Sequence, residues 1–124
     1  MIKYEKAMDL ETQIIKISRK LEMDHIDLSR VVCVRSYGSQ ARRTLARCHT
    51  LSRIMQKALN FKAHYVIEVI TENFDRLSEE EQTKTLIHEL MHIPKAFRGG
   101  FRYHDHVTEK NVNEMYKRFM SIRP

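Results

Sequence analysis

The chain has 124 residues, of which 42% are hydrophobic and 31% are charged, the ordinary range for a soluble globular protein and far from that of disordered chains. No apolar run approaches the roughly 18 residues of a membrane-spanning helix, and the N-terminal stretch MIKYEKAMDLETQ is too charged for the core of a signal peptide. We therefore expect one domain over residues 1–124, located in the cytoplasm and without a membrane partner.

The formal net charge of +6 is distributed unevenly. No acidic residue occurs between Asp27 and Glu68, whereas eight arginines and lysines fall within residues 30–62. Such a segment can attract nucleic acid or an acidic protein partner, and the alternative is a solvated basic face. The two cysteines, Cys33 and Cys48, lack the C-x-x-C spacing of a zinc ribbon, so we expect small buried apolar residues.

The first half of the chain predicts helices and strands in alternation. Leu10, Ile14 and Ile17 recur at helical spacing, whereas RVVCVRS is rich in β-branched residues and HYVIEVI is nearly apolar throughout. LARCHTL alternates more weakly, and LSRIMQKALN fits a short helix. The predicted elements are a helix over 4–22, strands over 30–36, 45–51 and 64–70, and a helix over 51–60.

The second half predicts two helices separated by a turn. After a loop over 71–77, Ser78 and Glu81 form a capping box that begins a helix over 79–93. Pro94 and the glycines at 99 and 100 end that helix, and a final helix follows over 107–119. This order indicates an α+β domain in which helices pack on a small twisted sheet of about three strands.

The predicted helix over 79–93 contains the motif H-E-x-x-H. His88 and His92 are four residues apart, so both imidazoles project from one face and can reach one metal ion. Glu89 is then placed to act as the general base on a metal-activated water. The alternative is a chance pattern in a histidine-rich chain, but the motif lies on an independently predicted helix after a strand.

A catalytic zinc ion takes three protein ligands, so a third must come from elsewhere. The downstream segment offers His104, His106 and Asp105, in that order of preference. His104 and His106 would lie about 6–7 Å apart in an extended strand, so one ion would not bind both without a tight bend. The unused candidates would hydrogen-bond the free ring nitrogen of a ligand, or remain exposed loop residues.

The stretches YVIEVI, FDRLSEEEQTKTLIHELMHIP and GGFRYHDH resemble the small zinc metallopeptidases of archaea, bacteria and phages, which are related to the SprT-like and minigluzincin-like proteases. The likeness extends over most of the chain. It implies a zincin-like domain with an N-terminal helix, a small sheet, an active-site helix and a closing helix. It also implies one Zn²⁺ ion, a peptide or protein substrate, and a third ligand after the glycine turn, which corresponds to His104.

The sequence departs from two related patterns. The continuation H-x-x-G-x-x-H of metzincins is missing after His92. The downstream helix glutamate of gluzincins has weak counterparts in Glu109 and Glu114.

The expected reaction is hydrolysis of peptide bonds with Glu89 as general base. Tyr103 and Arg102 are candidates to stabilise the oxyanion, whereas Tyr65 is expected in the core or on the sheet surface. If residues 64–70 form an edge strand, an extended substrate would pair with it. The rival function is a non-proteolytic metal-binding module whose basic segment, residues 30–62, binds nucleic acid or an acidic protein partner.

Overall fold

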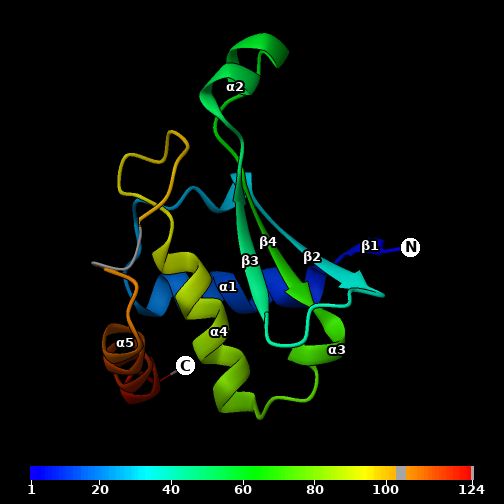
Figure 1. Ribbon diagram of the computed structural model, residues 1–124. Coiled ribbons are helices and arrows are strands. Elements are labelled where there is room, and N and C mark those ends of the chain that lie inside the picture. Colours follow the sequence, from blue (N-terminus) through cyan, green and yellow to red (C-terminus); the bar gives the residue numbers. More distant parts are fainter. Residues whose placement is uncertain (103–105, 124) are drawn as a thin grey trace.

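The computed structural model describes residues 1–102 and 106–123, which form a four-stranded sheet packed with helices (Figure 1). The elements are β1 Lys3–Lys6, α1 Met8–Lys20, β2 Val31–Tyr37, β3 Ala46–Thr50, α2 Arg53–Leu59, β4 Tyr65–Ile70, α3 Thr71–Phe74, α4 Glu79–Met91 and α5 Glu109–Ser121, with a 3₁₀ turn over Leu28–Arg30. The α+β class is confirmed. The sheet has one strand more than the expected three, and the loop expected over 71–77 begins with the short helix α3.

The strand order is β1-β2-β4-β3, so β4 lies inside the sheet. Its Ile67 faces Cys33 of β2 in a parallel pair and Cys48 of β3 in an antiparallel pair. Residues 64–70 are therefore paired on both sides, which rules out substrate pairing along this strand, and the two edge strands are β1 and β3. A nearly apolar strand is typical of an interior position, because both of its faces are buried.

Strand β1 replaces the beginning of the predicted N-terminal helix. Its four residues are all exposed, and they pair antiparallel with β2, Lys3 opposite Tyr37 and Lys6 opposite Val34. Helix α1 begins at Met8, four residues after the predicted start, and just before it the Ala7 backbone N–H donates to the Cys33 carbonyl oxygen at 2.9 Å. The residues of β1 show no alternation of apolar and polar side chains that would predict a strand. The strand is stabilised by backbone pairing to β2 and not by burial of side chains.

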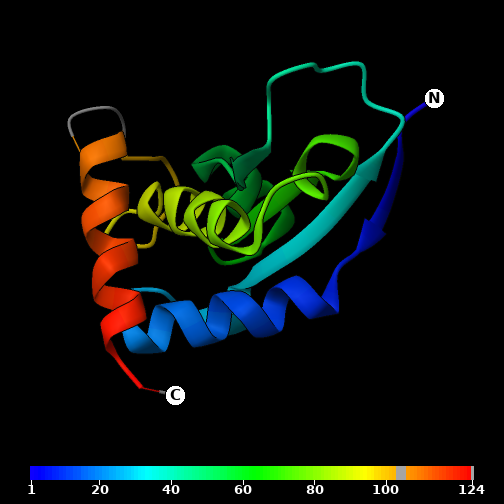
Figure 2. The ribbon, with the colours of Figure 1, turned by 90° about the horizontal axis from the view of Figure 1, so that it is seen from below.

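Helix α4 is central to the packing. It contacts β3, α1 and α5, and it lies between α5 and the sheet in two perpendicular views (Figures 1 and 2). The Ser78 hydroxyl accepts a hydrogen bond from the Glu81 backbone N–H at 3.2 Å, so the capping box begins the helix as predicted. Leu86, Ile87 and Leu90 are fully buried. Burial of this apolar face positions the polar residues of the same helix.

A buried carboxylate attaches the edge strand to the interior strand. Glu68 of β4 is 6% exposed, and its carboxylate accepts from His49 Nε2 at 2.7 Å and lies 3.7 Å from Arg47 Nη1. Burial raises the pKa of Glu68, but hydrogen bonds from His49 and Ser36 and the positive charges of His49 and Arg47 outweigh burial and lower it overall. β3 is therefore held to β4 by side chains as well as by its backbone ladder.

Several cations of the basic segment have acidic partners elsewhere in the chain. Arg30 pairs with Asp27 at 2.8 Å, and Arg35 pairs with Asp9 at 3.0 Å. Together with the Arg47 contact, these pairs reduce the uncompensated charge that the sequence alone indicated. Among the described residues, both cysteines are free, with Cys33 buried and Cys48 partly buried. None of the helices in this part of the chain is long and apolar enough to cross a membrane.

Candidate metal centre

His88 and His92 point their imidazoles at one another from the C-terminal end of α4. Their Nε2 atoms are 3.2 Å apart, with the ring centroids at 5.0 Å. Two nitrogen ligands at about 2.0–2.1 Å from a tetrahedral Zn²⁺ ion lie about 3.3–3.4 Å from each other. The separation of the two Nε2 atoms therefore fits a shared metal ion.

The backbone of Arg102 sets the tautomer of His92. His92 Nδ1 lies 2.6 Å from the Arg102 carbonyl oxygen, and the Arg102 N–H donates to the His92 carbonyl at 2.8 Å. Because a carbonyl oxygen can only accept, Nδ1 carries the proton and Nε2 keeps its lone pair. A metal-binding histidine commonly has its second ring nitrogen tied to a backbone carbonyl in this way.

Glu89 is buried beside the two histidines. It is 6% exposed, and burial raises the pKa of its carboxyl to about 7. The negative charge of Glu89 also contributes to the raised pKa of the Cys48 thiol, which places the carboxylate near β3. A carboxyl group with a pKa near neutrality is suited to accept and return a proton.

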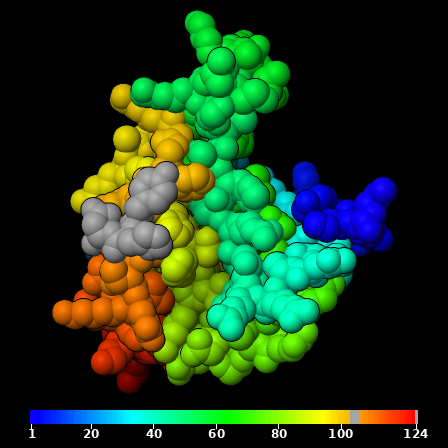
Figure 3. Space-filling model, viewed as in Figure 1, coloured from blue at the N-terminus to red at the C-terminus, as the bar shows by residue number. Residues whose placement is uncertain are grey.

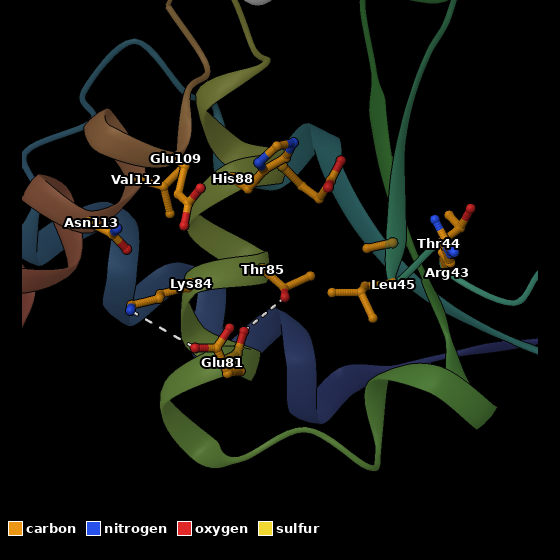
Figure 4. A pocket seen from close by; sticks show the side chains of 12 residues that line it. Arg43, Thr44, Leu45, Glu81, Lys84, Thr85, His88, Glu109, Val112 and Asn113 are labelled. Carbon is orange, nitrogen blue, oxygen red and sulfur yellow. Dashed lines mark hydrogen bonds and ion pairs between the residues drawn. The ribbon is translucent and has the colours of Figure 1, made fainter.

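A cavity of about 460 Å³ adjoins His88 and Glu89. Its walls come from the edge segment before and at the start of β3, from α4, and from the first turn of α5 (Figure 4). Figure 4 shows Leu45 pointing toward Thr85 from the edge segment, with Val112 and Asn113 on the opposite side of α4. The lining residues are Arg43, Thr44, Leu45, Ala46, Glu81, Lys84, Thr85, His88, Glu89, Glu109, Val112 and Asn113.

The hydroxyl of Tyr65 fastens the glycine turn that precedes Arg102. It donates to the Gly100 carbonyl at 3.0 Å and accepts from the Gly99 N–H at 3.1 Å, while the Gly100 N–H donates to the Thr50 hydroxyl at 3.2 Å. A side chain at Gly99 would lie 3.0 Å from the Gln56 amide nitrogen, and its φ of +103° also favours glycine. The turn that leads to the His92 partner is thus bound to β3 and β4.

Sequence reasoning placed Tyr65 in the core or on the sheet but missed the role of its hydroxyl. The side chain is fully buried, with its ring 5.0 Å from that of Phe97. A tyrosine inside an apolar strand is a weak signal, because a buried hydroxyl needs a partner. The partner lies 35 positions further along the chain, so the sequence could not identify it.

The candidates for a third ligand lie mostly outside the described residues. These are His104 and Asp105, together with the oxyanion candidate Tyr103. His106 lines a second cavity of about 180 Å³ with Arg102, and its carbonyl accepts from Asn111 Nδ2 at 2.8 Å. Within residues 1–102 and 106–123, no three His, Cys, Asp or Glu side chains form a group that could hold a metal ion. Within the described part of the chain, the candidate metal centre therefore consists of two potential ligands, His88 and His92.

The fold and this histidine pair define a small α+β protein with two histidines facing each other at one end of its central helix. A sequence model of one protein family, described as "Putative phage metallopeptidase", matches residues 2–121. The chain belongs to this family, which confirms the resemblance to small metallopeptidases. The family description implies a hydrolase of peptide bonds, a metal ion and a protein substrate. No curated protein and no solved structure matches the chain.

Proposed function

We propose that the protein is a zinc-dependent metallopeptidase in which His88 and His92 hold the ion together with His104. The observation that carries the proposal is the 3.2 Å separation of the two Nε2 atoms, with Glu89 buried next to them. The Arg102 carbonyl keeps the His92 lone pair directed toward the ion. His106 and Asp105 remain the alternatives for the third position.

The residues around the ion have separate roles in the proposed hydrolysis. A zinc ion held by His88, His92 and His104 would supply Lewis-acid polarisation of the scissile carbonyl and would lower the pKa of a bound water. Glu89 takes the proton of the attacking water and transfers it to the leaving amine, for which a pKa near 7 is well matched. Tyr103 and Arg102 are proposed to stabilise the oxyanion. The Arg102 backbone also orients His92.

The substrate would lie along β3 and not along β4. Leu45 and Leu51 form backbone hydrogen bonds with the Ile70 and His64 ends of β4. Because ladder bonds alternate along an antiparallel pair, the N–H and C=O groups of residues 46, 48 and 50 point away from β4. Ala46 also lines the cavity that contains His88 and Glu89. An extended peptide added at this edge would therefore pass the candidate site.

The substitution Glu89→Gln tests the proposal. It should lower hydrolysis of an unfolded protein such as casein by about 100-fold or more, because general acid–base catalysis contributes roughly 10²–10⁴-fold. Zinc content measured by elemental analysis should stay at one ion per chain, whereas His88→Ala should lose the ion. A wild-type protein that takes up no divalent ion, or a Glu89→Gln variant with full activity, would contradict the proposal.

The rival function has no such support. Neither the family match nor the described residues indicate nucleic-acid binding, and Arg30, Arg35 and Arg47 have acidic partners within the chain.

A further inference from the structure

Helix α2 exposes its apolar residues to solvent. The segment of residues 51–64 connects β3 to β4, and we call it the α2 arm. Figures 1 and 3 show it projecting beyond the rest of the molecule. Four of the large hydrophobic residues that the structure exposes lie on this arm: Ile54 at 76%, Met55 at 45%, Leu59 at 49% and Phe61 at 60%. An apolar cluster exposed at a projection marks an interaction surface.

The arm is amphipathic, with its polar side toward the protein. Gln56 Nε2 donates to the Leu51 and Arg98 carbonyl oxygens, both at 2.9 Å. At 100° per residue the apolar side runs from Ile54 to Leu59, and Ile54 at its border lies only about 60° from the exposed Lys57, so one bound segment can reach both kinds of side chain. The orientation of α2 is set by polar contacts at its base, so the apolar side is left uncovered.

The charge on the arm has one sign. Arg53, Lys57 and Lys62 lie within it, and no acidic residue occurs between Asp27 and Glu68. These three cations have no ion pair within the described residues, in contrast to Arg30 and Arg35. Two copies of such an arm would repel each other, so the charge favours an acidic partner over a second copy of the same surface.

The arm is continuous with the edge strand that borders the candidate site. At one end of β3, Ala46 lines the same cavity as Glu89. Two residues after the other end of β3, the Ser52 hydroxyl caps α2 by accepting a hydrogen bond from the Met55 N–H. The base of the arm also contacts the loop before the glycine turn through Gln56 and Arg98. A polypeptide that leaves the site along β3 would therefore reach α2.

We propose that the α2 arm binds a segment of the protein substrate in which acidic and large apolar side chains alternate or cluster, several residues from the scissile bond. This inference rests on the proposed peptidase function and names the class of substrate. The apolar side chains of the segment pack on Ile54 and Leu59, and its carboxylates pair with Arg53 and Lys57. Helix α2 begins at Arg53, seven positions after Ala46, and an extended substrate paired along β3 advances about as far per residue as the strand does, so the segment lies roughly seven residues from the one opposite Ala46.

The experiment measures peptide binding separately from hydrolysis. Fluorescein-labelled 20-residue peptides are titrated with the full-length Glu89→Gln protein loaded with zinc, and Kd is read from anisotropy. One peptide carries a cluster of Glu and Leu residues seven positions N-terminal to its centre, and a second carries the same cluster seven positions C-terminal to its centre. Each has a matched control peptide in which Lys replaces every Glu. One of the two acidic peptides should bind roughly ten-fold more tightly than its lysine counterpart, with a smaller ratio at 1 M salt, where the screening length falls to about 3 Å.

Substitutions in the arm should remove this preference. The double variant Arg53→Glu/Lys57→Glu should abolish or reverse it, because surface attractions worth up to about five-fold each become repulsions. Ile54→Ser should weaken binding of both peptides. The matched controls are Lys117→Glu on α5 and Met8→Ser on α1, whose side chain is 72% exposed. Neither control should alter the preference, and circular dichroism should show all variants folded.

Several outcomes would overturn the inference. Equal Kd values for the acidic and the lysine peptides would overturn it, even if the wild-type protein hydrolyses both. A dimer in sedimentation that Ile54→Ser converts to monomer would assign the surface to a second copy. Binding to phosphatidylserine vesicles without any peptide preference would assign it to lipid. By contrast, a clear peptide preference without hydrolysis by the wild type would contradict the peptidase function and leave the arm as an acidic-polypeptide binding surface.

Discussion

At the scale of single residues, the candidate site depends on groups that act through a neighbour. His92 offers its Nε2 atom because the Arg102 carbonyl oxygen accepts a hydrogen bond from its Nδ1–H. Arg102 follows a turn whose glycines are hydrogen-bonded to the Tyr65 hydroxyl. The motif H-E-x-x-H singled out His88, Glu89 and His92 from spacing alone, and their roles as metal ligands and general base stay predictions. The hydroxyl of Tyr65 and the carbonyl of Arg102 carry no such spacing signal.

We expect Tyr65→Phe to weaken zinc binding without unfolding the protein. Loss of the hydroxyl leaves the Gly99 N–H and the Gly100 carbonyl without their partner, which should lower the free energy of unfolding by about 1–3 kcal/mol. The affinity for Zn²⁺, measured by competition with a chromogenic chelator, should fall up to about ten-fold as the His92 partner loosens.

The control for this change is Tyr4→Phe, since Tyr4 is 62% exposed on β1 at the opposite edge of the sheet. It should leave zinc affinity unchanged. A Tyr65→Phe protein that is less stable yet binds zinc with wild-type affinity would show that the hydroxyl is structural and does not position His92.

At the scale of elements, most of the chain followed its periodicity. The predicted strands over 30–36, 45–51 and 64–70 correspond to β2, β3 and β4, and the helices over 51–60, 79–93 and 107–119 correspond to α2, α4 and α5. The prediction missed β1, which lacks a buried face, and it left open whether β4 is an edge or an interior strand. An edge is a property of the assembled sheet, because it depends on which strands find partners.

The position of the edge leads to a prediction about proline substitutions in β3. In Ala46→Pro the missing N–H would face away from β4, so the sheet should persist and the variant should remain folded. If an extended substrate pairs there, KM should rise several-fold through loss of one hydrogen bond worth about 0.5–1.5 kcal/mol. Kinetics with a fluorogenic peptide would provide the measurement.

The matched control is Arg47→Pro, in which the missing N–H would face β4 and the ladder itself would be interrupted. This variant should be clearly less stable in thermal unfolding. Unchanged KM in a folded Ala46→Pro protein would exclude pairing of the substrate at this position of β3.

At the scale of the whole molecule, the helix with the histidine pair is held among β3, α1 and α5 (Figure 2). The glycine turn that follows it is hydrogen-bonded to Tyr65 of β4. The candidate site therefore draws on segments from distant parts of the chain. A ligand that binds the folded form but not the unfolded chain stabilises the fold by mass action.

Zinc should therefore raise the thermal stability of the whole molecule. At a free concentration 100-fold above Kd the gain is about 2.7 kcal/mol, which corresponds to a rise in Tm on the order of 10 °C for a chain of this size. Differential scanning calorimetry with zinc and with EDTA would measure the shift, and His92→Ala should abolish it. An identical Tm with and without zinc in the wild-type protein would contradict a metal site that involves the core helix.

The sequence by itself determined the types of most elements and the histidine pair, because helical and strand periodicity and an i, i+4 spacing act over a few neighbouring residues. Only the tertiary structure decided that β3 is an edge strand and β4 an interior one, that Tyr65 holds the turn before Arg102, and that the apolar side of α2 faces solvent. Each of these depends on contacts between segments far apart in the chain, such as Tyr65 with Gly100 and Gln56 with Arg98. Local patterns do not encode such contacts, since they arise only when the elements pack together.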